Sequence, residues 1–86
     1  MLQHVSVEVE PARTRACVGF YELLGFREVA PPGALAERAT WLERAGTQIH
    51  LMRIDDPVRL PQGHFALVVD DYPATLERLR SAGHEP

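Results

Sequence analysis

The chain has 86 residues, of which 45% are hydrophobic and 24% are charged, and its formal net charge is −3. A chain of this length forms at most one domain and buries only about 60 to 65% of its unfolded surface, so its core is small. It contains no apolar run long enough to span a membrane, no signal-peptide pattern and no basic cluster that would follow phosphates. We therefore expect a cytoplasmic protein that binds neither membranes nor nucleic acid.

Residues 2–9 alternate between apolar and polar side chains, which predicts a strand that is covered on one side only. The valines of this run take the covered face, and His4, Ser6 and Glu8 take the other. Ser6 and Glu8 could contact a substrate or orient an imidazole bound to a metal, and a solvated strand position explains them equally well.

A helix follows, with Pro11 in its first turn, apolar residues at spacings of three and four, and Gly25 at its end. The single cysteine, Cys17, falls inside this helix, so we expect a small buried hydrophobe and neither a disulfide nor a cysteine-based zinc site. Residues 26–29 predict a short strand, and residues 31–33 predict a loop.

Residues 39–43 and 48–52 predict a hairpin whose short loop contains a glycine. In the second strand, His50 shares one face with Met52. Trp41 and Met52 could line an apolar substrate pocket, although core packing is at least as good an explanation for Trp41.

His64 opens a second alternating run, residues 64–69, which lies 60 residues after His4 and again precedes a helical pattern. The repeat predicts a first module at residues 1–54, a linker at 55–63 and the start of a second module at 64–86. His84 follows the glycine that ends this helix, so we expect a solvated turn residue there. The spacings also predict a helix-to-sheet core formed by Val5, Val7, Val9, Phe20, Leu24, Phe65, Leu67, Val69, Leu76 and Leu79.

A strand histidine at the same place in each unit suggests that pseudo-symmetry brings two imidazoles together, which makes a candidate metal site. The sequence carries a family resemblance in the His4 strand and in three further segments: FYELLGF at 20–26, QIHL at 48–51 and GHFALVVD at 63–70. Together these resemble the vicinal oxygen chelate superfamily, which includes glyoxalase I, the bleomycin and fosfomycin resistance proteins, methylmalonyl-CoA epimerase and the extradiol dioxygenases. The resemblance implies an α+β fold of paired βαβββ modules, with the second module incomplete and reduced to a strand and a helix.

In that superfamily, a divalent metal is held by residues of the first and fourth strands of each module. Carried over by position, the resemblance implies His4, His50 and His64 as metal ligands, with Zn, Ni, Fe, Mn or Co as the ion. The fourth ligand of the family, usually a glutamate, would lie beyond Pro86, so the resemblance implies a family member that is cut short. It identifies no catalytic base.

Three functions are compatible with this resemblance. The first is a metal-dependent lyase or isomerase of the glyoxalase type, which acts on a small-molecule substrate chelated through neighbouring oxygens. The second is a metal-free binding protein of the bleomycin-resistance kind, and the third is an extradiol dioxygenase with Fe(II). A lone strand at 64–69 would leave its backbone groups unpaired, so either further strands of the same protein or a second copy of the chain completes the sheet. We also expect a homodimer, with the His4 and His64 strands close to the interface.

Overall fold

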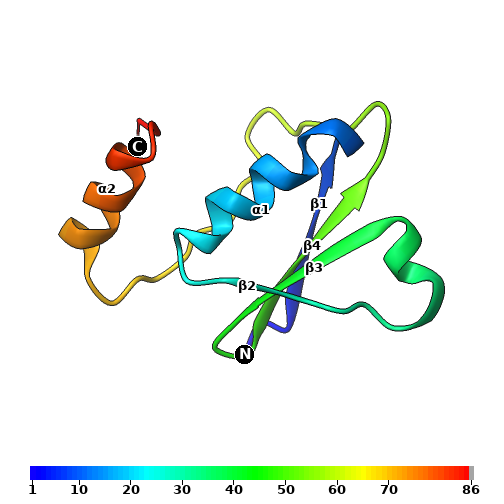
Figure 1. Ribbon diagram of the computed structural model, residues 1–86, viewed down its shortest axis with the longest axis horizontal. Helices are drawn as coiled ribbons and strands as arrows, with labels where there is room; N and C mark the ends of the chain where they lie inside the picture. Colours follow the sequence, from blue (N-terminus) through cyan, green and yellow to red (C-terminus); the bar gives the residue numbers. More distant parts are fainter. Residues whose placement is uncertain (86) are drawn as a thin grey trace.

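The computed structural model, which describes residues 1–85, contains one four-stranded sheet, a helix on one face of that sheet and a second helix beyond the first (Figure 1). In chain order its elements are β1 (His4–Val9), the 3₁₀ turn η1 (Pro11–Arg13), α1 (Thr14–Glu22), β2 (Arg27–Val29), the 3₁₀ turn η2 (Gly33–Glu37), β3 (Ala39–Arg44), β4 (Thr47–Arg53) and α2 (Tyr72–Ser81). The predicted βαβββ order is therefore confirmed, and η2 replaces part of the expected loop. Within the described residues, neither helix has the length and apolarity needed to cross a membrane.

The sheet has the order β1-β4-β3-β2. β1 runs parallel to β4, and the other neighbouring strands are antiparallel. The predicted hairpin closes through a two-residue turn, Ala45 and Gly46, whose φ angles are 49° and 84°. Positive φ at both central positions gives the turn the twist that a tight hairpin requires, and this turn sets the pairing of β3 with β4.

The core lies between α1 and the inner strands of the sheet. Leu42, Ile49 and Leu51 are fully buried, and Val9, Val18 and Phe26 surround them. The prediction missed the centre of the core, which is formed by Leu42 of β3 and by Ile49 and Leu51 of β4. These two strands have a neighbour on each side, whereas β1, which supplies the predicted valines, lies at an edge of the sheet. Of the predicted core residues, Val9 and Leu79 are buried, Phe65 is 36% exposed, and the others are half-buried. Cys17 is half-buried and packs against this core, as expected.

The expected strand at 64–69 does not form, and residues 54–71 contain neither helix nor strand. A strand needs a neighbour to accept and donate its backbone hydrogen bonds, and no described strand lies in register with this segment. The helix of the second unit does form: the Asp71 side chain accepts a hydrogen bond from the Ala74 N–H at 3.0 Å and so caps its start. The division into a first module, a linker and the start of a second module stays a prediction. The last residue of the predicted second module, Pro86, lies outside the described residues.

Helix α2 stands next to the end of α1 (Figure 1). Arg78 donates a hydrogen bond to the Leu23 carbonyl at 3.2 Å. The His84 ring meets the Phe20 ring edge to face, with 5.0 Å between centroids. His84 is half-buried by this contact, so the expectation of a solvated turn residue is wrong. The turn after α2 folds back because the His84 N–H donates to the Leu79 carbonyl, and this brings the imidazole onto α1.

Candidate functional site

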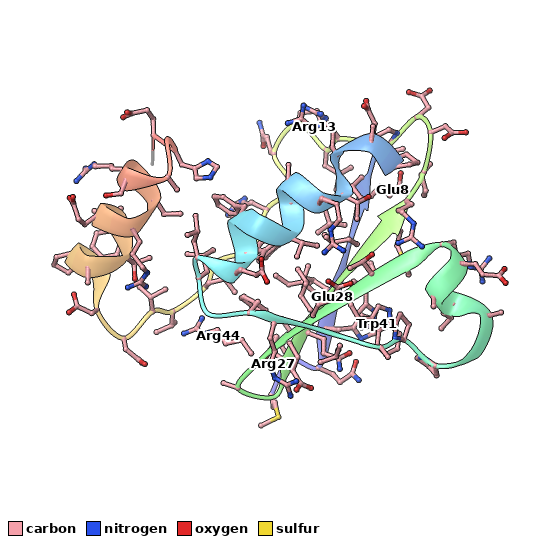
Figure 2. All side chains as sticks on the ribbon, viewed as in Figure 1. Glu8, Arg13, Arg27, Glu28, Trp41 and Arg44 are labelled. Atoms are coloured by element: carbon pink, nitrogen blue, oxygen red, sulfur yellow. The ribbon has the colours of Figure 1, made fainter. Side chains whose placement is uncertain are left out.

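The candidate site lies on the face of the sheet opposite α1. Side chains directly across neighbouring strands share a face, and the register pairs Ser6 with His50 and His50 with Trp41. Figure 2 shows Trp41 on the side of the sheet away from α1. We call this surface the open face, and it carries His4, Ser6, Glu8, Trp41, Glu43, Gln48, His50 and Met52.

Three aromatic rings stack across the open face. The His4 and His50 ring centroids are 4.1 Å apart with an interplanar angle of 15°, and the Trp41 and His50 centroids are 3.9 Å apart with an angle of 1°. Trp41 lies directly opposite His50 on the neighbouring strand, and adjacent strands are about 4.8 Å apart, so these two rings meet at stacking distance. His4 lies opposite Gln48 and reaches the His50 ring diagonally. His50 is the middle ring and is only 7% exposed, while His4, at the edge of the sheet, is exposed.

A side-chain amide oxygen lies against one ring nitrogen of each imidazole. His50 Nε2 lies 2.8 Å from Gln48 Oε1, and His4 Nδ1 contacts Gln3 Oε1. The Gln48 amide is oriented by Glu43, which accepts from its nitrogen, so the Gln48 oxygen accepts from the Nε2–H of a neutral His50. His50 Nδ1 is therefore the ring nitrogen that keeps a lone pair.

A polar chain continues from His50 across the sheet to the opposite edge. The Gln48 amide donates to a Glu43 carboxylate oxygen at 3.4 Å, and the other carboxylate oxygen accepts from Arg27 at 3.0 Å.

Burial lowers the pKa of His50 below its ordinary value of 6.5, and the neighbouring His4 lowers it further. Both causes favour the neutral imidazole, which is the form that binds metals.

His64 lies away from this pair. It is exposed, its Nδ1 is 3.0 Å from the Gln62 carbonyl oxygen, and it lines an apolar cavity together with valines of the opposite face of β1. Among residues 1–85 no three His, Cys, Asp or Glu side chains lie close enough together to hold a metal ion. The structure thus brings His4 and His50 together and leaves His64 apart. A single copy offers two imidazole donors in nearly parallel planes, and the three-histidine set stays a prediction.

Several residues of the site were not expected from the sequence. Gln48 and Glu43 acquire their roles through the hairpin register, which pairs them directly. In the sequence, only the two-residue spacing between Gln48 and His50 indicates that the Gln48 amide lies on the same strand face as the imidazole. Glu8, at the far end of β1 (Figure 2), accepts a hydrogen bond from the Val58 N–H at 2.8 Å and so anchors the start of the connecting segment.

No protein-family model matches this sequence, and no curated protein matches it significantly. Among solved structures, the chain is similar to the crystal structure of a candidate glyoxalase family protein from Bacillus anthracis, with a TM-score of 0.81 and 21% sequence identity. The match covers 96% of this chain and 70% of that chain. At this level of identity the likeness shows the fold, and the fold is glyoxalase-like, as the resemblance implied.

Proposed function

We propose that this protein is a metal-dependent enzyme of the glyoxalase type, a lyase or isomerase, whose site is built on the open face around His4 and His50. The observation that carries the proposal is the pair of stacked imidazoles on adjacent strands, of which the buried one, His50, donates a ring N–H to the Gln48 amide oxygen. A histidine that ligates a metal typically donates its other ring nitrogen in this way, because the partner fixes the tautomer and the ring orientation.

In this proposal His4 Nε2 and His50 Nδ1 are the ligand atoms. When bound, a divalent ion would act as a Lewis acid toward neighbouring substrate oxygens. The protein's own contribution is orientation: Gln48 holds the His50 ring, Glu43 holds the Gln48 amide, and Arg27 holds the Glu43 carboxylate. Stacking between Trp41 and His50 contributes to the burial that lowers the pKa of the middle imidazole and so favours its neutral form.

The first test is metal binding, measured by calorimetry with Zn²⁺, Ni²⁺ and Co²⁺ and by elemental analysis of the purified protein. The variants His4→Ala and His50→Ala should each lose stoichiometric metal. The variant Gln48→Ala should weaken metal affinity by about 10- to 100-fold, because it removes an orienting partner and no ligand. His84→Ala is the matched control, since that imidazole packs on Phe20. Unchanged metal content in the His4→Ala/His50→Ala double variant would overturn the proposal.

His64→Ala tests the remaining part of the expected ligand set. Loss of metal in this variant, with the fold intact by circular dichroism, would mean that His64 reaches the ion in the assembled protein. Activity is assayed on the metal-loaded protein with the thiohemiacetal of glutathione and a 2-oxoaldehyde as the first substrate.

The ring stack supports a second candidate function, a metal-free binding protein for planar ligands. The outer face of the His4 ring lies at the exposed edge of three parallel rings, where a flat aromatic ligand could continue the stack. In that case the protein treated with a chelator should bind a planar aromatic compound with a change in the fluorescence of Trp41. His4→Ala should then weaken ligand binding while added metal has no effect.

A further inference from the structure

Side chains that lie opposite each other on neighbouring strands divide the open face into three rows. The first row contains His4 and the second contains His50. The third row lies at the far end of β1 (Figure 2), where Glu8 is opposite Met52 and Met52 is opposite Ala39. The proposed function uses the first two rows and gives no role to the third.

The open face carries two carboxylates, Glu8 and Glu43, and only one of them is paired with a cation. Glu43 forms an ion pair with Arg27 of β2, with 3.0 Å between the carboxylate oxygen and the guanidinium nitrogen. The other ion pair among residues 1–85, Arg15–Glu28, lies on the opposite face of the sheet. Within the described residues, the Glu8 carboxylate is therefore the one fixed charge of the open face that has no partner of opposite sign.

The backbone of the connecting segment holds the Glu8 carboxylate in place. The Val58 N–H donates to Oε1 of Glu8 at 2.8 Å, and no other hydrogen bond among residues 1–85 reaches this carboxylate. The side chain is exposed, so a ligand on the open face has access to it. An ionised carboxylate can accept several hydrogen bonds, and one bond at Oε1 leaves Oε2 to accept from a ligand.

The cation that follows the third row along β4, Arg53, lies on the other face of the sheet. Arg53 is opposite Val9, which is buried in the core. Its guanidinium donates to the Thr40 hydroxyl and to the Ala36 carbonyl, both at 2.7 Å. Because successive side chains of a strand alternate between faces, Arg53 does not neutralise Glu8.

Glu8 is a diagonal neighbour of the buried imidazole. Glu8 is opposite Met52, and His50 lies two residues before Met52 on the same face. The spacing of adjacent strands and of residues along a strand puts the Cα atoms of Glu8 and His50 about 8 Å apart. A small ligand held at His50 can therefore lie over Met52 and place a group that is a few bonds away beside the Glu8 carboxylate.

We propose that the third row is a subsite for a positively charged group of the ligand and that Glu8 is the residue that selects this group. The inference rests on the proposed function, because it takes the open face as the binding site. The ligands of this class carry an ammonium or guanidinium group a few bonds from the two neighbouring oxygens that bind beside His4 and His50. A ligand with a carboxylate at the same place is disfavoured, because like charges then face each other.

Three hydroxamates of matched chain length test the subsite. The hydroxamate group binds a metal ion through two neighbouring oxygens, so the compounds differ only in the charge at the far end. They are γ-aminobutyrohydroxamate, which is cationic, valerohydroxamate, which is neutral, and glutaromonohydroxamate, which is anionic. Calorimetry on the Zn²⁺-loaded protein at low salt measures their dissociation constants. We expect the cationic compound to bind about two- to fivefold more tightly than the neutral one, as for an exposed ion pair, and the anionic compound to bind most weakly.

Glu8→Gln should abolish this preference and keep the fold. The variant removes the charge but retains an oxygen that can accept from the Val58 N–H. The affinity for the neutral compound should therefore stay the same, while the cationic compound loses its advantage. Glu28→Gln is the matched control, because it removes the same charge on the opposite face of the sheet and should leave the preference intact. Salt at about 0.5 M should reduce the preference in the unmodified protein, because it screens exposed charges.

The outcomes separate the subsite from the proposed function. If the Zn²⁺-loaded protein binds the three hydroxamates equally well, the subsite is refuted and the metal site stands. A preference for the cationic compound that persists in Glu8→Gln, or that disappears equally in Glu28→Gln, would also refute the role of Glu8. A protein that binds no Zn²⁺ would overturn the proposed function and the subsite together.

Discussion

The centre of the core makes a quantitative prediction at Ile49, which lies on the inner strand β4 and has no exposed surface. Ile49→Val removes one methylene, worth about 0.8 kcal/mol of transfer free energy, and should cost about 0.5 to 1.5 kcal/mol in the free energy of unfolding. Ile49→Ala removes three carbons, or about 2.4 kcal/mol of transfer free energy, and the cavity left behind raises the cost to as much as about 5 kcal/mol. In a domain of this size the melting temperature should fall by about 10 °C or more.

Urea unfolding at a fixed protein concentration measures these costs, with the fluorescence of Trp41, the only tryptophan, as the signal. Val58→Ala is the matched control: Val58 is 67% exposed, so its truncation should change stability by less than about 0.5 kcal/mol. If Ile49→Ala costs no more than Val58→Ala, α1 does not pack on β4 as described and the core assignment is refuted.

Three further predictions concern a cap, a turn and a titration. Asp71→Ala should cost about 0.5 to 2 kcal/mol, because it removes the side chain that caps α2, and loss of helical circular dichroism measures it. Gly25→Ala should destabilise the protein by at least about 1 kcal/mol, because Gly25 has a φ of 92°. Gly19→Ala should stabilise it by about 0.5 to 1 kcal/mol, because Gly19 lies within α1 with open space around it. Thermal unfolding that ranks the two variants in the opposite order would contradict the backbone assignment. Since the pKa of His50 is lowered on folding, its contribution to stability is complete above pH 6.5 and is lost as the pH falls below that value. His50→Gln should therefore flatten the pH dependence of the urea midpoint, and an unchanged dependence in this variant would contradict the prediction.

The order of elements could be predicted from the sequence because the signals are local. The alternation in residues 4–9, the helical spacing before Gly25 and the glycine in the hairpin loop each act within one turn or one strand. The position of the core could not be predicted as well. Val5 and Leu42 have similar patterns in sequence, but only the strand order shows that β3 is an inner strand and β1 an edge. The prediction of a strand at 64–69 was wrong for the same reason. The local pattern of this segment is that of a strand, but a strand also needs a neighbouring strand, and the local pattern does not specify one.

The candidate site depends on register in the same way. Alternation placed His4 and His50 on polar faces of their strands, but the parallel pairing of β1 with β4 is what brings the two rings within 4.1 Å. The turn at Ala45 and Gly46 then fixes Trp41 opposite His50, so one two-residue turn determines both the stack and the amide chain that orients His50. His64 has an equally regular pattern and no such pairing, and its side chain lies apart. A histidine in a strand therefore becomes part of a site only when a second strand fixes its register.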